Sequence, residues 1–189
     1  LHLTTEEECD FLRTLPREHH ISTEVCPQHL VLTSPECYEH LGTKAQMNPP
    51  IRSKRHTVAL WQALKDGIID CIATDHAPHT LSEKNQPYGR SPSGMPGVET
   101  SLPLMLDRVN KDLCTLPEVV YWMSESPAKL YKMHGKGRIE VGQDADLALI
   151  DMSLKKKVTN GKLHTRVNWS PFDGMELQGW PVRTIVNGQ

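Results

Sequence analysis

Ligand-type side chains follow three apolar segments of the sequence. In "CIATDHAPHT" an apolar run ends at Asp75, and His76 and His79 follow within four residues. His2 ends the first candidate strand, and His29 follows the second, in "EVCPQHL". Two imidazoles and a carboxylate suit Zn²⁺ or a similar cation, and an aspartate next to a metal-bound water can accept that water's proton. The residue types predict a metal site, although an aspartate in this position could also simply cap the next segment.

The first half of the chain alternates between helix and strand signals. A capping box at Thr5 predicts a helix over residues 5–15, and "ISTEV" then alternates like a strand. "HTVALWQALKDG" predicts a helix with Val58, Trp61 and Leu64 on one face, and "IIDCIA" predicts a buried strand. This alternation indicates parallel β/α units in a barrel or a doubly wound sheet, covered by helices. Functional groups gather at the C-terminal strand ends of both folds, which is where the candidate ligands lie.

The second half turns helical and then extended. A capping box starts at Thr115, and Ser126-Pro127 is typical of an N-cap with proline in the first turn, here of a helix that ends at His134-Gly135. After it, "RIEVGQDADLALIDM" holds two short apolar segments around a turn, and "TIVNGQ" gives another strand-and-turn signal. We expect a first unit over residues 1–134 and a small β-sandwich segment over residues 135–189.

Composition and charge argue against several classes of protein. The 189 residues are 38 % hydrophobic, enough for a core, and contain no apolar run of about 18 residues that would predict a transmembrane helix. The 21 Lys and Arg against 23 Asp and Glu give a net charge of −2, which argues against nucleic acid as a partner. Five scattered cysteines without a CxxC pair are typical of reduced thiols. We expect a cytoplasmic protein that does not bind membranes, and the start "LHLTTEEE", without methionine, predicts an incomplete chain.

Five blocks in order carry a family resemblance: "LHLTT", "EVCPQHLVLT", "AQMNPPIRS", "DGIIDCIATDHAPHTLSEK" and "SPSGMPGVETSLPLML". Together they resemble the second half of a dihydroorotase of the class I type, in the amidohydrolase superfamily. "KGRIEVGQDADLALID" and "SPFDGMELQGWPVRTIVNGQ" continue the resemblance to the end. The resemblance implies an α/β fold, the C-terminal part of a (β/α)8 TIM barrel with a small appended β domain.

The same resemblance implies roles for individual residues. His2 and Asp75 resemble metal ligands, and Asp75 also resembles the catalytic general acid and base. The positions that resemble substrate contacts are Asn48, His79, Ser93 and Gly94. The implied cofactor is Zn²⁺, as one or two ions.

Structural roles stay open for several of these residues. His2 could be a frayed terminus, and Asn48 before two prolines is a good turn former without any ligand. The family usually has two histidines after the proline, whereas the first is Gln28 here, so His29 could support the ligands from behind or only pack. His76 could serve a structural hydrogen bond.

The implied reaction is the reversible, metal-dependent cyclisation of N-carbamoyl-L-aspartate to (S)-dihydroorotate, in de novo pyrimidine biosynthesis. The alternatives are an allantoinase or hydantoinase, because "CPQ" is found among hydantoinase-like sequences, and a non-catalytic dihydroorotase-like subunit. A homo-oligomer or a complex with aspartate carbamoyltransferase is left open. The family's other metal ligands, an H-x-H pair among them, are absent from this sequence, so we expect the 189-residue chain alone to lack stable folding and turnover.

Overall fold

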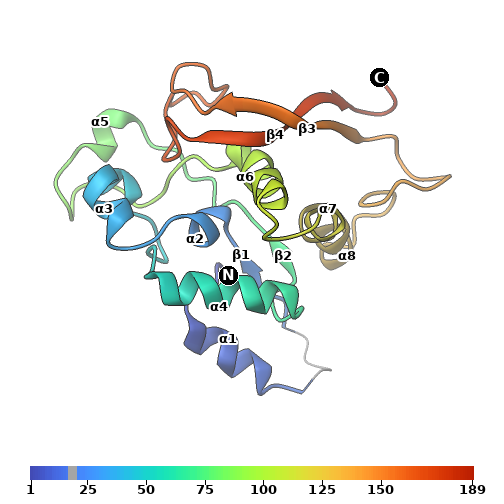
Figure 1. The fold of residues 1–189 in the computed structure, drawn as a ribbon, viewed down its shortest axis with the longest axis horizontal. Coiled ribbons are helices and arrows are strands. Elements are labelled where there is room, and N and C mark those ends of the chain that lie inside the picture. The colour runs from blue at the N-terminus through green and yellow to red at the C-terminus, as the bar shows by residue number, and fades with distance from the viewer. Residues whose placement is uncertain (17–20) are drawn as a thin grey trace.

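The computed structural model describes residues 1–16 and 21–189 (Figure 1). The helical elements are α1 Glu6–Arg13, α2 Pro27–Val31, α3 Glu36–Leu41, the 3₁₀ turn η1 Gly42–Ala45, α4 Lys54–Lys65, α5 Leu81–Lys84, α6 Val98–Asn110, α7 Leu116–Val120, the π turn η2 Tyr121–Glu125 and α8 Ser126–Leu130. The strands are β1 Glu24–Val25, β2 Cys71–Ile72, β3 Leu147–Lys157 and β4 Glu176–Ile185. Over these described ranges, none of the helices has both the length and the apolar character needed to span a membrane.

A short parallel ladder carries the candidate ligands. Glu24 of β1 pairs with Cys71 of β2, and Val25 pairs with Ile72. On the other side of β1 the Leu3 N–H donates to the Glu24 carbonyl at 2.9 Å, so the first residues of the chain extend the same layer. Both predicted strands are present, and their parallel direction is confirmed. They are shorter than predicted because only two residue pairs form the ladder.

Helix α4 covers this ladder with a face that differs from the predicted one. Leu60 and Leu64 are buried in one cluster with Val25 and Ile72. Val58, which was expected on the same face, is 58 % exposed, so that part of the prediction was wrong. In a helix of 3.6 residues per turn, a face built on Leu60 and Leu64 turns Val58 outward.

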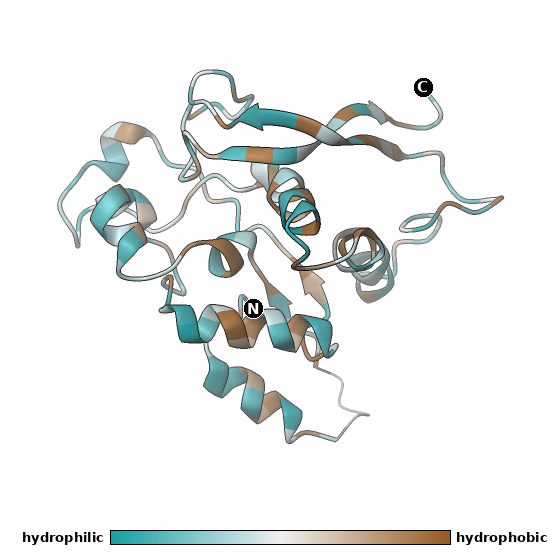
Figure 2. Cartoon of the chain, viewed as in Figure 1, coloured by the Kyte–Doolittle hydropathy of each residue, from teal (hydrophilic) through white to brown (hydrophobic). Residues whose placement is uncertain are grey.

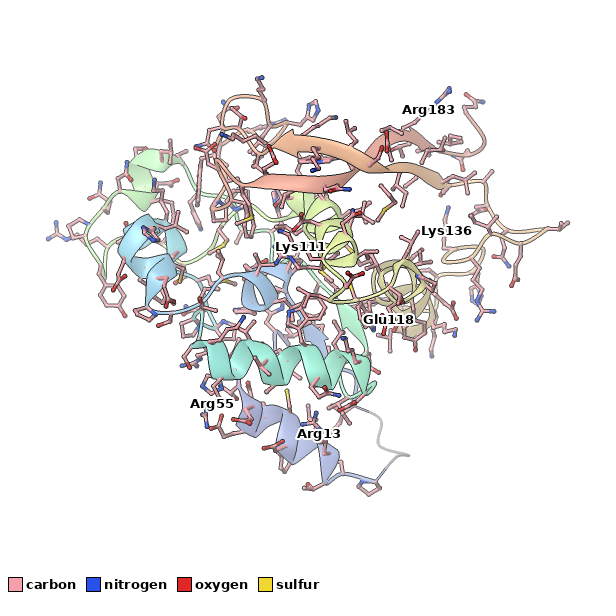
Figure 3. All side chains as sticks on the ribbon, in the orientation of Figure 1. Arg13, Arg55, Lys111, Glu118, Lys136 and Arg183 are labelled. Atoms are coloured by element: carbon pink, nitrogen blue, oxygen red, sulfur yellow. The ribbon has the colours of Figure 1, made fainter. Side chains whose placement is uncertain are left out.

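Two arginines connect α4 to its neighbour α1, and Figure 3 labels both. Arg13 donates to Asp66 at 3.0 Å, and Arg55 pairs with Glu6 at 3.2 Å. Because both arginines are partly or largely exposed, each pair stabilises the helix contact by about 0.2–1 kcal/mol. The capping box predicted at Thr5 is confirmed at the start of α1.

The predicted N-cap at Ser126 was wrong. The capping box at Thr115 starts α7 as predicted, but the chain then continues through η2 into α8 without a break. The Ser126 hydroxyl donates to the Asp70 carbonyl at 2.6 Å, just before β2, because the side chain is buried against that strand. The helix ends at Leu130, four residues earlier than predicted.

The antiparallel hairpin of β3 and β4 lies across α6 (Figure 1), and both strands carry hydrophobic as well as hydrophilic residues (Figure 2). Leu177 of β4 and Leu104 of α6 meet in a buried cluster with Phe172. Gly179 permits the close approach, because its φ is +100° and a Cβ there would lie 2.6 Å from the Leu106 Cβ.

The apolar segment that precedes the hairpin forms no strand. Ile139 is 87 % exposed, and the region between Lys136 and Asp146 consists of turns and bends. The hairpin therefore starts only at Leu147, and just before it the Ala145 carbonyl accepts from the Gly188 N–H at 2.9 Å. The division of the chain near residue 135 and the sandwich architecture stay predictions.

Candidate active site

His2 and Asp75 meet at the C-terminal end of the parallel ladder. The His2 Nε2 lies 3.6 Å from the Asp75 Oδ1, although 73 residues separate them in sequence. Both residues have positive φ, 55° for His2 and 43° for Asp75. Non-glycine residues in the left-handed region are uncommon; they occur in turns and cluster at active sites, where the surrounding structure holds a side chain in place. The structure thus brings together the two residues that resemble metal ligands.

Glu24 holds the His2 ring. Its Oε1 lies 2.8 Å from the His2 Nδ1, and its side chain is only 10 % exposed. The Cys26 Sγ lies 3.3 Å from the same nitrogen. A carboxylate acceptor fixes the proton on Nδ1 and leaves the Nε2 lone pair facing Asp75, which is the tautomer that a metal ligand needs. Burial raises the pKa of the Cys26 thiol well above its usual range, so it stays protonated beside the pair.

Glu24 was missed in the sequence, although a signal was present. It is the one charged residue in "STEVC", and β1 is buried on both of its residues. A buried carboxylate in a strand needs a partner, and a histidine is a suitable one. What the sequence did not show was which residue of the neighbouring segment it meets.

His29 lies near the pair but makes a different bond. Its Nε2 lies 3.0 Å from the Pro49 carbonyl, and its Nδ1 is buried with no hydrogen-bond partner among the described residues. Burial lowers the pKa of His29 to about 4, so the ring is neutral at physiological pH, and His2 and Asp75 act on it electrostatically. The position of His29 is more suitable for support of the turn at Pro49 than for coordination of a metal ion.

Gln28, which replaces the first of the family's two histidines, has a structural contact. Its Nε2 donates to the Thr74 carbonyl at 2.8 Å, and the side chain is buried. Thr74 immediately precedes Asp75, so this bond fixes the backbone that presents the carboxylate. Gln28 therefore replaces a histidine without adding a group to the site.

The residues that resemble substrate contacts form a second cluster. The Asn48 Nδ2 donates to the Ser93 Oγ at 3.1 Å, and the His79 Nε2 lies 3.1 Å from the Ser93 carbonyl. The Gly94 N–H is already bonded to the Gln46 carbonyl at 3.0 Å, so it is engaged within the protein. Four of the predicted positions are thus adjacent, while the contact of Gly94 with a substrate stays a prediction.

Gly94 itself is required by its surroundings. Its φ is +122°, and a Cβ would lie 2.6 Å from the Ala77 Cβ. The turn therefore passes directly against the segment that links Asp75 to His79. This contact explains how the two clusters are held next to each other.

His76 makes a structural hydrogen bond, which is one of the roles that the sequence suggests for it. Its Nδ1 accepts from the Gly97 and Val98 N–H groups, at 3.1 and 3.2 Å. These N–H groups lie at the start of α6, where the helix has no acceptor of its own. His76 therefore caps α6.

The His2–Asp75 pair fits part of a metal site. Two ligands of a tetrahedral Zn²⁺, each about 2.0–2.1 Å from the ion, lie roughly 3.3 Å apart, close to the observed 3.6 Å. Within residues 1–16 and 21–189, however, no group of three or more His, Cys, Asp or Glu side chains could hold an ion. Metal binding by His2 and Asp75 therefore stays a prediction.

Comparison with known proteins shows what the chain is similar to. The amidohydrolase family model matches residues 2–189. The curated dihydroorotases of Ruminiclostridium cellulolyticum and Geobacillus thermodenitrificans are 40 % and 39 % identical to it over 189 residues, in alignments that span 99 % of this chain and 44 % of each relative. Among solved structures, the L-hydantoinase (dihydropyrimidinase) from Arthrobacter aurescens superposes with a TM-score of 0.93 at 34 % identity, over 100 % of this chain and 43 % of that one. The chain has the predicted α/β fold of part of a TIM barrel and spans less than half the length of these relatives.

Proposed function

Because the chain belongs to the amidohydrolase family, we propose that it is the C-terminal half of a dihydroorotase, which cyclises N-carbamoyl-L-aspartate to (S)-dihydroorotate reversibly in de novo pyrimidine biosynthesis. The observation that carries the proposal is the pairing of His2 with Asp75 at adjacent strand ends, in a chain whose curated relatives are named dihydroorotases. Glu24 adds support, because a buried carboxylate behind a histidine is typical of metal ligands.

His2 and Asp75 would hold a divalent cation, which by family resemblance is Zn²⁺. The complete site would contain one or two such ions. When bound, such a cation polarises the substrate carbonyl and makes a coordinated water more acidic. The remaining ligands would come from the part of the full-length protein that precedes this chain. Asp75 is 25 % exposed on its side chain and therefore accessible to both water and substrate.

The proton transfers would be the task of Asp75. In the hydrolytic direction, the oxygen of a water adds to the carbonyl carbon of the ring amide, and the carbon–nitrogen bond of that amide breaks. Asp75 accepts the proton that the water releases and delivers it to the departing nitrogen, so that the carboxylate is restored. In the direction of synthesis the same steps run backwards.

The substrate carboxylate would bind at the cluster of Asn48, His79 and Ser93. The Ser93 hydroxyl and the Asn48 amide are donors of suitable chemistry, and the His79 ring lies beside them with its Nε2 facing the Ser93 carbonyl. Gly94 lies against Ala77, two residues after Asp75, so the cluster is beside the segment that carries the proposed proton carrier.

A second candidate is a hydantoinase, because the L-hydantoinase superposes with a TM-score of 0.93. The "CPQ" motif does not favour it further, because Gln28 is occupied with the Thr74 carbonyl. Rates of the full-length, zinc-loaded protein with dihydroorotate, allantoin and a 5-substituted hydantoin decide between them. We expect kcat/KM to be about tenfold or more higher for dihydroorotate. A preference for allantoin or the hydantoin would replace the proposal.

A non-catalytic dihydroorotase-like subunit is the rival from another class. It gains support only if the sequence ahead of Leu1 lacks the H-x-H pair. The geometry argues against it, because a scaffold has no need for two strained residues that face each other at strand ends. Assembly into a homo-oligomer or with aspartate carbamoyltransferase and a cytoplasmic location stay predictions.

A further inference from the structure

Lys84 is a fully buried lysine that the proposed mechanism does not use. It is the last residue of α5, and its relative exposure is 0 %. Its amine donates to the Gln46 carbonyl at 2.9 Å and to the Pro92 carbonyl at 2.7 Å. No ion pair of the described residues includes it, so two backbone carbonyls are the known partners of this charge.

Such an arrangement is costly. Burial of an ammonium group without a carboxylate is unfavourable, and it lowers the pKa of Lys84 to about 8. A methionine would fill a similar volume without this cost. The hydrogen bonds of the amine must therefore fix a backbone geometry that apolar packing alone would not fix.

The amine of Lys84 thus joins the segment around Gln46 to the segment around Pro92, and its backbone joins the same two segments. Its carbonyl accepts from the Thr43 hydroxyl and, at 3.2 Å, from the Ser91 hydroxyl. The Gln46 side chain also crosses between the segments, since its Nε2 donates to the Ser91 carbonyl at 2.9 Å. The end of α5 is therefore bonded to one segment through Thr43 and Gln46, and to the other through Ser91 and Pro92.

These two segments carry the proposed carboxylate site. Asn48 follows Gln46 by two residues, and Ser93 follows Pro92 directly. The Gln46 carbonyl that accepts from Lys84 also accepts from the Gly94 N–H. The hydrogen bond between Asn48 and Ser93 thus spans the two turns on one side, and the Lys84 amine spans them on the buried side.

We propose that Lys84 is a positioning residue that sets the distance between the turns at residues 46–48 and 92–94, and through them the affinity for the substrate carboxylate. This inference rests on the proposed function, because it assigns the carboxylate to the cluster of Asn48, His79 and Ser93. His2 and Asp75 have no hydrogen bond to Lys84, so the loss of its amine should change substrate binding more than the chemical step.

Lys84→Met in the full-length, metal-loaded protein tests this, with Lys44→Met as the matched control. Lys44 lies in the neighbouring η1 turn and is only partly buried, and the same substitution there leaves both turns bonded. We expect Lys84→Met to raise the KM for dihydroorotate about tenfold or more, with kcat within about threefold of the parent, since hydrogen bonds to charged groups are the stronger ones. An unchanged KM, or a fall in kcat alone, would overturn the inference.

Hydrogen exchange provides a readout that does not depend on turnover. Peptides that cover residues 91–97 should exchange faster in Lys84→Met than in Lys44→Met, because the Gly94 N–H bonds to the carbonyl that Lys84 polarises. Equal exchange in the two variants would contradict the proposal.

If Lys84→Met does not fold, Ser91→Ala removes one of the hydroxyl bonds to the Lys84 carbonyl with a smaller perturbation. We expect the KM to rise by about threefold in this variant, and a parental KM would overturn the inference. If the parent protein turns over a hydantoin instead of dihydroorotate, the proposed function fails, and the hydrogen exchange of residues 91–97 alone then decides whether Lys84 sets the two turns.

Discussion

Replacement of Glu24 by glutamine tests whether the His2–Asp75 pair is held for a metal ion. The Glu24 Oε1 lies 2.8 Å from the His2 Nδ1, and the two side chains are only 10 % and 18 % exposed. Glutamine keeps the shape and an acceptor oxygen but removes the charge. It also introduces an amide that can turn its N–H groups toward the ring, which would favour the wrong tautomer of His2.

The size of the effect follows from the place of the Glu24 carboxylate, which lies beside the ring nitrogen of His2 that faces away from Asp75. The low exposure of both side chains means that water does little to weaken this contact. We therefore expect Glu24→Gln to weaken zinc binding by roughly 10–100-fold, the range typical of such supporting carboxylates.

Competition with a chelator of known affinity measures this in the full-length protein. Glu39→Gln is the matched control, because Glu39 is exposed on α3 and makes the same change in charge. At saturating zinc, turnover of the Glu24 variant should recover in part, because Asp75, the proposed proton carrier, is intact. A zinc affinity equal to that of the parent would refute the assignment of Glu24 and weaken the case for His2 as a ligand.

Three further predictions concern catalysis, stability and pH. Asp75→Asn in the full-length enzyme should lower kcat by roughly 10²–10⁴-fold, since an amide cannot carry the proton, and near-parental turnover would remove Asp75 from the mechanism. Gly179→Ala should lower the free energy of unfolding by about 1–3 kcal/mol through contact with Leu106, as measured by urea unfolding. Gly142→Ala, with positive φ but open space, separates that contact from backbone strain, and equal effects would contradict the contact. Because the pKa of His29 is lowered to about 4, below about 6.5 in an unfolded chain, its contribution to stability is present above pH 6.5 and is lost as the pH falls toward 4. Unfolding midpoints at several pH values should show this loss in the parent and less of it in His29→Gln.

Local signals in the sequence were sufficient for the elements but not for the contacts between them. The capping boxes at Thr5 and Thr115 correctly placed helix starts, because the cap and its partner lie within three residues. Ser126-Pro127 carries an equally local signal and failed, because the hydroxyl found a partner at Asp70, 56 residues away. Local patterns cannot show when a distant acceptor competes with the helix end.

Because local patterns do not reveal distant contacts, only part of the candidate site could be predicted from the sequence. The sequence placed His2 and Asp75 at strand ends, and parallel strands bring such ends together without further information. The partners behind them are set by register and side-chain packing, which is why Glu24 and Lys84 were missed. Family resemblance did not recover them either, because it was carried by the residues that would touch metal or substrate.

The structure supports the two parts of the site in physically separate ways. Glu24 of β1 and Gln28 of α2 support His2 and the backbone before Asp75, and both side chains are buried. Lys84 of α5 supports the turns that carry Asn48 and Ser93, through the Gln46 and Pro92 carbonyls. No hydrogen bond among the described residues links these two sets of supports directly. Because groups without shared partners act nearly independently, the proposed function predicts that Glu24 variants change metal affinity and Lys84 variants change substrate affinity, each with little effect on the other.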